Sequence, residues 1–342
     1  MVRVGLAGLG FMGGTHAQCH AALPNAELVA VCDVEKDRRD KFAATYGAKP
    51  YASLDAMLSS DIDMVDLCLP TYLHREAVEA AAAAKKHVLC EKPMALTPAD
   101  CDAMMAAVEK AGVRFMVGHV IRFWPEYQVI KDILDSGRLG RILWMSATRM
   151  SPPPTWSWQE WIFDPKRSGG AVLDLHIHDL DFIAWILGPP KTVYAGGVKT
   201  KHGGLDSVFT TTTGHPNGAV GMAEGCLDMA AEFPFTMGLK INLEGGSIEL
   251  NSRLSPALVV APRDGGVEHP EVPQPEVPAS GSAGAAGNIE ALGGYFIEVK
   301  YFVDRLDKGE VPTVVTPEEA KAAVELCLAA TKSMETGRTV AL

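Results

Sequence analysis

Short apolar runs and longer helix-like segments alternate along the first third of the chain. The short runs are rich in valine and leucine, as buried strands are, and the longer segments have helical spacing or many alanines. Strands that alternate with helices favour a parallel sheet with right-handed crossovers. We expect strands at residues 2–7, 27–32, 63–69, 87–90 and 114–117, and helices at 14–23, 35–46, 53–58, 75–85 and 97–112.

The pattern changes after residue 119, where strand-like runs begin to follow one another closely. Short connections between successive strands favour an open, mainly antiparallel sheet. Residues 151–170 form a loop rich in proline and tryptophan, and residues 262–287 form a second long loop. We expect strands at 142–149, 192–199, 207–213, 219–226, 235–243, 247–250 and 257–260, and helices at 125–136, 174–187, 289–306 and 317–336.

The first strand leads directly into three glycines with the spacing G-x-G-x-x-G, namely Gly8, Gly10 and Gly13. A strand, a tight turn and a helix start are the context that a dinucleotide site needs. Gly8 permits the turn, Gly10 lets the backbone approach a pyrophosphate, and Gly13 lets the helix pack on the strand. The free N–H groups at the helix start then face the phosphates. An ordinary glycine turn is the alternative.

A carboxylate at the end of the second strand favours the nucleotide site over that alternative. Asp33 lies twenty residues after Gly13, where it can accept hydrogen bonds from the adenosine ribose hydroxyls. It could instead cap the helix that begins near Glu35. Asp33 would repel the 2′-phosphate of NADP, so we expect NAD to be preferred, although Lys36 and Arg38 lie nearby.

Composition narrows the functional classes. The 342 residues suffice for two domains with sizeable cores, and the hydrophobic fraction of 47% is that of a globular protein. A net charge of -11 argues against a nucleic-acid binder or a polybasic membrane protein, and no apolar run is long enough to span a bilayer. Seven scattered cysteines without a C-x-x-C pair, and no secretory leader, indicate a reducing, cytoplasmic location.

Two stretches carry candidate chemistry at strand and helix ends. Pro93 biases Lys92 away from helix, which holds this lysine extended at the end of a strand beside the expected nicotinamide. On a helix, Asp174 and His178 share a face, so the carboxylate can orient the imidazole. The imidazole can then take a proton from a substrate hydroxyl. A solvated Lys92, and an Asp174 that only caps its helix, are the alternatives.

Three further positions are less defined. His176 and His178 could suggest a metal, but on a helix they point to different sides and no cysteine pair assists, so we expect no metal. His119 follows the strand expected at residues 114–117. Arg122 lies at the junction of the two halves, where it either binds substrate or braces the junction, and we favour bracing.

Six stretches of the chain carry family motifs: A-G-L-G-F-M-G-G-T-H-A at 7–17, L-P-T-Y-L-H at 69–74, C-E-K-P-M-A-L-T at 90–97, G-H-V-I-R-F-W-P at 118–125, G-G-A-V-L-D-L-H-I-H-D-L-D at 169–181 and E-T-G-R-T-V-A-L at 335–342. With them the chain resembles the glucose–fructose oxidoreductase / inositol dehydrogenase / rhizopine-catabolism family (Gfo/Idh/MocA). The resemblance implies an α/β protein with a doubly wound Rossmann domain at residues 1–121. A domain with a large open, mainly antiparallel sheet follows at 122–342, for substrate binding and oligomerisation.

The resemblance also implies site residues. The catalytic set is Lys92, Asp174 and His178, while His176 stands where many relatives carry a small residue. The expected substrate contacts are Lys92, His119, Arg122, Asp174 and His178, and the loop at 151–167 has no family pattern and could set substrate choice. The expected cofactor contacts are Gly8, Gly10, Phe11, Met12, Gly13, Asp33, Arg38, Leu69, Pro70, Thr71, His74, Glu91 and Lys92.

The function that these expectations favour is an NAD(P)-dependent dehydrogenase. It would transfer a hydride between the nicotinamide and a hydroxyl or carbonyl of a sugar, an inositol-like polyol or a related compound. The rival is a non-catalytic sensor of nucleotide or sugar on the same fold. Retention of Lys92, Asp174 and His178 together argues against a sensor, which needs no proton relay. Family members commonly pair their sheets, which implies a homodimer or homotetramer.

Overall fold

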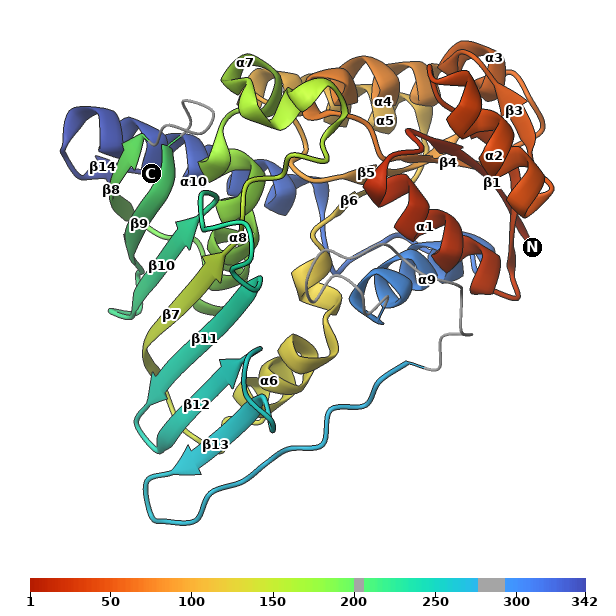
Figure 1. Ribbon diagram of the computed structural model, residues 1–342. Coiled ribbons are helices and arrows are strands. Elements are labelled where there is room, and N and C mark those ends of the chain that lie inside the picture. Colours follow the sequence, from red (N-terminus) through yellow and green to blue (C-terminus); the bar gives the residue numbers. More distant parts are fainter. Residues whose placement is uncertain (200–205, 276–292) are drawn as a thin grey trace.

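The computed structural model describes residues 1–199, 206–275 and 293–342 and has two sheets, each in its own layer with helices (Figure 1). The first sheet has six parallel strands in the order β3-β2-β1-β4-β5-β6. Its helices are the crossovers between these strands, as the alternating pattern predicts. The strands are β1 (Val2–Ala7), β2 (Ala26–Cys32), β3 (Lys49–Tyr51), β4 (Met64–Leu67), β5 (His87–Glu91) and β6 (Phe115–Gly118); the helices are α1 (Phe11–Ala22), α2 (Lys36–Tyr46), α3 (Leu54–Leu58), α4 (His74–Ala83) and α5 (Pro98–Ala111).

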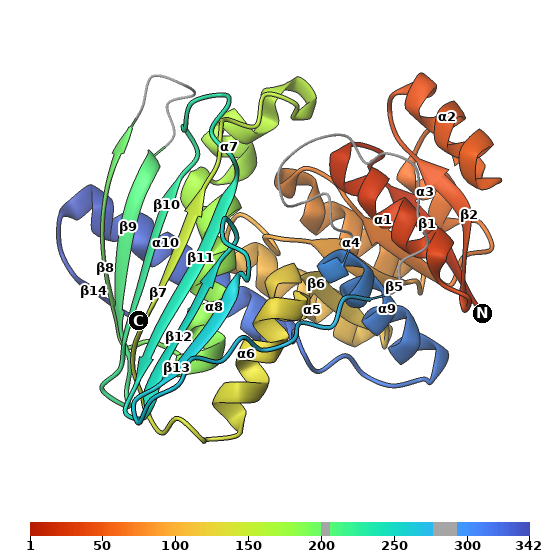
Figure 2. The ribbon, with the colours of Figure 1, turned by 60° about the horizontal axis from the view of Figure 1, so that its bottom comes forward.

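The second sheet has eight strands in the order β13-β12-β11-β7-β10-β9-β8-β14. It is antiparallel except where β10 runs parallel to β7, so the expected mainly antiparallel sheet is confirmed. Figure 2 shows the strands as one broad layer with α6 and α8 toward the first domain. The elements are β7 (Ile142–Met150), β8 (Thr192–Lys199), β9 (Asp206–Gly214), β10 (Val220–Cys226), β11 (Thr236–Leu243), β12 (Gly246–Asn251), β13 (Leu258–Pro262), β14 (Val340–Ala341), α6 (Pro125–Asp135), α7 (Pro165–Ser168), α8 (Ile177–Leu187), α9 (Gly293–Asp307) and α10 (Pro317–Thr336).

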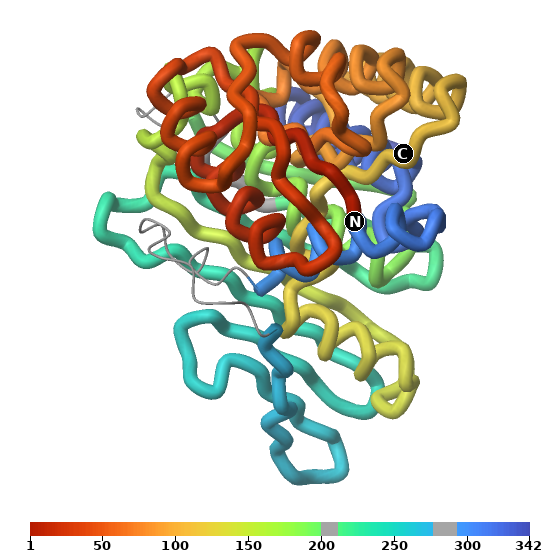
Figure 3. Tube along the Cα trace, turned by 90° about the vertical axis from the view of Figure 1, so that its right-hand side faces the viewer, coloured from red at the N-terminus to blue at the C-terminus, as the bar shows by residue number. Residues whose placement is uncertain are grey.

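The last helices connect the two sheets. Helix α9 packs on α1 of the first domain, and α10 contacts α8 and β8 of the second domain as well as α5 and β6 of the first. The N-terminal amine lies 3.2 Å from Asp307, and Figure 3 shows the N-terminus beside the blue C-terminal helices. The division at residues 121/122 stays a prediction, and the chain crosses back over it after residue 293.

Two local differences from the sequence pattern matter. Strand β3 falls on a stretch for which the sequence predicts no element. The expected helix at 174–187 begins instead with a π-helical turn, Val172–His176, before α8. Part of the loop expected at 262–287 and the start of the helix expected at 289 lie outside the described residues. Among the described residues, no helix combines the length and the apolar run needed to cross a bilayer.

Candidate active site

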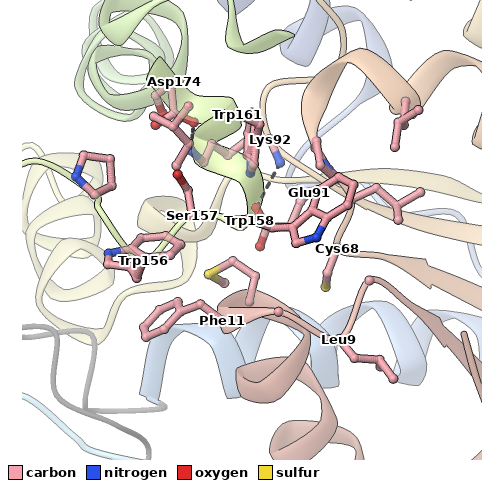
Figure 4. Close-up of a pocket in the computed structure, with 18 of the residues that line it drawn as sticks. Leu9, Phe11, Cys68, Glu91, Lys92, Trp156, Ser157, Trp158, Trp161 and Asp174 are labelled. Carbon is pink, nitrogen blue, oxygen red and sulfur yellow. Dashed lines mark hydrogen bonds and ion pairs between the residues drawn. The ribbon is translucent and has the colours of Figure 1, made fainter. Parts of the chain in front are cut away.

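A cavity of about 1200 Å³ lies at the carboxyl ends of the first sheet's strands, where a doubly wound fold binds its ligands. Both domains line it. The first contributes the glycine loop, the ends of β2 and β4, and Glu91 and Lys92 after β5. The second contributes Asp174 and His178 together with a loop of tryptophans (Figure 4).

The glycine loop has the shape that a dinucleotide requires. Gly8 has a φ of +87°, and a Cβ there would lie 2.3 Å from the carbonyl oxygen of Cys68. A Cβ on Gly13 would lie 1.9 Å from the carbonyl oxygen of Gly8, so the helix can approach the strand only through glycine. A Cβ on Gly10 would meet nothing within 4 Å, which leaves open space beside the backbone. These residues fit a bound pyrophosphate.

Asp33 is held rigidly at the mouth of the cavity. Its Oδ2 accepts the N–H of Leu9 at 2.7 Å and its Oδ1 accepts the N–H of Glu35 at 2.8 Å. Arg38 also lines the cavity, with a guanidinium nitrogen 4.0 Å from the same carboxylate. Asp33 therefore both braces the glycine loop and presents a fixed carboxylate where a ribose is expected.

Lys92 crosses from the first domain to the second. Its Nζ donates to the backbone carbonyl of Asp174 at 2.7 Å and lies 3.4 Å from Oδ1 of the same residue. The lysine side chain is 17% exposed, so it is not the solvated surface lysine of the alternative reading. The structure thus brings Lys92 and Asp174 together, although 82 residues separate them in sequence.

His178 lines the same cavity, but in the described residues its Nδ1 does not form the hydrogen bond to Asp174 that the sequence predicts. Its Nδ1 is buried without a hydrogen-bond partner in the described part of the chain. The reason is the π-helical turn, which carries Asp174 and places more residues in each turn than the α-helix on which the expected i, i+4 pairing depends. In this structure Asp174 therefore orients Lys92 rather than His178.

His119 and Arg122 lie behind the cavity rather than on its wall. Arg122 is 2% exposed and forms a bidentate pair with Asp181 at 2.7 and 2.9 Å, with Glu319 as a further partner at 2.8 Å. His119 is 1% exposed, 3.5 Å from Asp181, and burial lowers its pKa. The geometry supports the bracing role for Arg122 and gives neither residue a surface for substrate.

The remaining expected cofactor residues separate into two groups. Phe11, Met12, Leu69 and Pro70 line the cavity, whereas Gly13, Thr71 and His74 do not. The His74 ring lies between the carbonyl oxygens of Leu69, at 2.8 Å, and Pro93, at 2.9 Å. His74 therefore holds together the segments that follow β4 and β5, which is support for the site rather than contact with a ligand.

His176 points away from the cavity. Its Nε2 lies 3.0 Å from Oγ1 of Thr211 on β9, and burial lowers its pKa to about 3. His176 and His178 therefore point to different sides, as their helical spacing predicts. In the described residues, the group with metal-ligand spacing is instead His16, Asp66 and Cys68, where the imidazole and the carboxylate already pair with each other.

The proline- and tryptophan-rich loop expected at residues 151–170 is not irregular throughout, because it contains a 3₁₀ helix at Trp158–Phe163 and the short helix α7. This loop contacts the first domain at separate points. The ring of Trp156 lies 4.9 Å from that of Phe11, and Nε1 of Trp158 donates to Glu35 at 3.2 Å. Arg167 donates to the hydroxyl of Tyr72 at 3.3 Å. The sequence marks this loop by its composition, but no local pattern names these partners.

Arg149 is a cavity-lining residue that sequence reasoning missed. It projects from β7 and is fixed by two bonds to Asp179, at 2.9 and 3.0 Å. A signal for it exists in Asp179 itself, because a carboxylate within an apolar-striped helix requires a buried partner.

Comparison with known proteins was decisive for the family. Residues 2–119 match the family described as an oxidoreductase family with an NAD-binding Rossmann fold, and residues 127–249 match the GFO/IDH/MocA C-terminal domain. The chain belongs to the GFO/IDH/MocA oxidoreductase family. Its first domain is accordingly an NAD-binding domain, as the glycine loop and Asp33 predict.

The similarity to members of this family extends over the whole chain. The myo-inositol 2-dehydrogenase of Thermotoga maritima is 29% identical over 100% of this chain and 98% of its own length. The inositol 2-dehydrogenase of Rhizobium meliloti is 35% identical over 55% of each chain. A solved structure of a probable dehydrogenase from Thermotoga maritima superimposes with a TM-score of 0.82 at 28% identity, covering 99% of this chain and 98% of that one.

Proposed function

We propose that this protein is an NAD-dependent dehydrogenase that acts on a CH–OH group of a sugar, an inositol-like polyol or a related compound. The observation that carries the proposal is the meeting of Lys92, Asp174 and His178 in one cavity with the glycine loop. Relatives with names such as myo-inositol 2-dehydrogenase support this substrate class. NAD, when bound, supplies the hydride acceptor; the chain must supply the proton acceptor.

His178 is the proposed proton acceptor. Burial, together with the positive charges of Lys92 and Arg149, lowers the pKa of His178 well below its ordinary value, so the ring is unprotonated at neutral pH and free to accept a proton. The ammonium of Lys92, held by Asp174, favours the alkoxide that forms on the substrate oxygen. This division of roles differs from the sequence hypothesis only in the residue that Asp174 orients.

A panel of sugars and polyols with NAD tests the proposal through the absorbance of NADH. Formation of NADH with one class of polyhydroxy compound, and its loss in the variant Lys92→Ala, is the expected result. A protein that binds NAD and sugar but never forms NADH would instead be a sensor, which is the second candidate function.

The seven free cysteines support a reducing compartment, and we propose the cytoplasm.

NAD should bind more tightly than NADP by at least about tenfold, because the 2′-phosphate would face the fixed carboxylate of Asp33. Fluorescence titration of both cofactors measures the ratio. The variant Asp33→Ala should narrow it, whereas Asp37→Ala, an exposed carboxylate on α2, should leave it unchanged. Tighter binding of NADP by the unaltered protein would contradict the expectation.

The protein should form a homo-oligomer through the outer face of the second sheet. Tyr194, Val198, Val220 and Met222 are 37–58% exposed on β8 and β10, and register pairing through Thr212 places Tyr194 and Met222 in one cross-strand row. Exposed apolar patches of this kind mark interfaces. Light scattering should give a dimer or tetramer, and Tyr194→Asp with Met222→Glu should shift it toward the 36.5 kDa monomer. A monomeric unaltered protein at micromolar concentration would contradict this.

A further inference from the structure

A chain of three buried ionisable side chains lies beneath the nicotinamide end of the cavity. We call Asp66, His16 and Glu91 the ion chain. Asp66 on β4 and His16 on α1 are both 0% exposed, and Glu91 at the end of β5 is 6% exposed. No residue of the sequence hypothesis other than Glu91 belongs to it, and the proposed proton transfer does not use it.

The imidazole of His16 lies between two carboxylates. Its Nδ1 is 2.9 Å from Oδ2 of Asp66, and its Nε2 is 3.2 Å from Oε1 of Glu91. The Nδ1 contact is a hydrogen bond, whereas Nε2 and Oε1 of Glu91 lie at ion-pair distance without hydrogen-bond geometry. A carboxylate on each side of the ring favours the protonated, charged imidazole. Burial opposes the charged ring, but the charge and the hydrogen bond of Asp66, with further support from Cys68, together raise the pKa of His16 well above its ordinary value. His16 is therefore an imidazolium.

Six titratable groups pack around His16 and Asp66, namely His20, Cys19, Cys68, Cys90, Tyr295 and Glu298. On the side of Glu91 lie His74, His119 and Lys92. Burial raises the pKa of Glu298 well above its ordinary value, assisted by Glu91, and both of its oxygens are buried without a partner in the described residues. Burial likewise raises the pKa of Cys68 and of Tyr295. These three groups are therefore neutral and add no charge of their own beside the ion chain.

Glu91 carries this charge to the wall of the cavity. It lines the cavity next to Lys92, and its Oε2 accepts the backbone N–H of Lys92 at 3.0 Å (Figure 4). His16 stands directly behind it, with Asp66 one step farther from the cavity. A negative charge therefore faces the cavity, and a positive charge lies behind that negative charge.

We propose that Glu91 and His16 are tuning residues that set the relative affinity of the site for oxidised and reduced nicotinamide. The oxidised ring carries a positive charge that hydride addition removes, so a nearby fixed charge acts on one form only. The Glu91 carboxylate favours the oxidised form, and the His16 imidazolium opposes it. The proposal rests on the proposed use of NAD at this end of the cavity.

Dissociation constants of NAD⁺ and NADH, measured by calorimetry without any substrate, test the proposal. In Glu91→Gln the ratio Kd(NAD⁺)/Kd(NADH) should rise by about 3- to 20-fold, and in His16→Gln it should fall by a similar factor. This is the size of effect expected when one unit charge is removed from a buried position about a nanometre from the nicotinamide. Glu91→Asp keeps the charge and should keep the ratio. Glu35→Gln, a carboxylate beside Asp33 at the opposite end of the cleft, is the matched control and should also keep it.

The double variant His16→Gln, Asp66→Asn covers the case in which the single variant fails to fold around an unpaired Asp66. Its ratio should fall in the same direction but less, because Asp66 is the farther charge. Ratios that stay unchanged, or that move in the same direction in the Glu91 and His16 variants, overturn the proposal. An unaltered protein that binds neither NAD⁺ nor NADH contradicts the proposed function instead, so the two failures are distinguishable.

Discussion

Replacing His178 with alanine should lower the rate of hydride transfer by about 10²- to 10⁴-fold while leaving NAD affinity nearly unchanged. The reason is that His178 lines the cavity together with Lys92, and its lowered pKa leaves the ring unprotonated and able to accept a proton at neutral pH. Single-turnover mixing of enzyme, NAD and a substrate from the panel measures the step directly. Lys92→Ala should lower the same rate and weaken substrate binding, and Asp174→Asn should impair it with the fold intact.

The oxidation rate should also depend on pH in a direction set by the pKa of His178. A base whose pKa lies below its ordinary value is already unprotonated at neutral pH, so the oxidation rate should be level there. It should fall as the pH drops through the lowered pKa, because the protonated ring accepts no proton. His269→Ala, an exposed histidine, is the control and should retain full turnover. Wild-type turnover and an ordinary profile in His178→Ala would make Lys92 the leading base.

Replacing Arg122 with alanine should lower the free energy of unfolding by about 3–5 kcal/mol. The guanidinium is buried and holds Asp181 through two hydrogen bonds, so its removal leaves an unpaired carboxylate in the interior. The change also removes the hydrogen bonds from Arg122 to the carbonyl of Val314 and to Glu319. These two bonds hold the segment before α10, and the first turn of that helix, against Arg122.

Urea unfolding followed by circular dichroism measures this loss. Arg75→Ala is the matched control, because Arg75 pairs with Glu79 and Asp100 at the surface, where such pairs contribute about 0–1 kcal/mol. A variant Arg122→Ala that is as stable as the unaltered protein but has a raised KM would show that Arg122 binds substrate after all.

The elements that sequence reasoning locates are those with a strong local signal. Helix α5 begins where Thr97 caps it, accepting the N–H of Asp100, and ends at Gly112 with a φ of +69°. Strand β3 escapes because it has three residues, of which Lys49 and Pro50 are exposed, so it has no hydrophobic period. The π-helical turn at 172–176 is not predicted, because a π-helical turn differs from an α-helical one by one additional residue and the hydrophobic pattern here does not distinguish the two.

The same distinction between local and distant signals applies to the residues of the site. The glycine loop, Asp33 and Lys92 could be predicted because each belongs to a short motif of neighbouring residues that can be recognised in the sequence alone. Partnerships between distant segments are not encoded locally: Trp158 and Glu35 are 123 residues apart, and His16 and Asp66 are 50 residues apart. Asp66 did leave a trace, as a carboxylate within the apolar strand M-V-D-L, where a buried charge requires a partner.

The contacts of the tryptophan-rich loop have a consequence for how the protein reports its own state. Three of the six tryptophans, Trp156, Trp158 and Trp161, lie within this one segment and line the cavity. Two of them touch the first domain, at Phe11 and Glu35, so any separation of the domains breaks a contact of an indole ring. The intrinsic fluorescence of the unlabelled protein is thereby an optical gauge of the cleft, readable in real time during turnover.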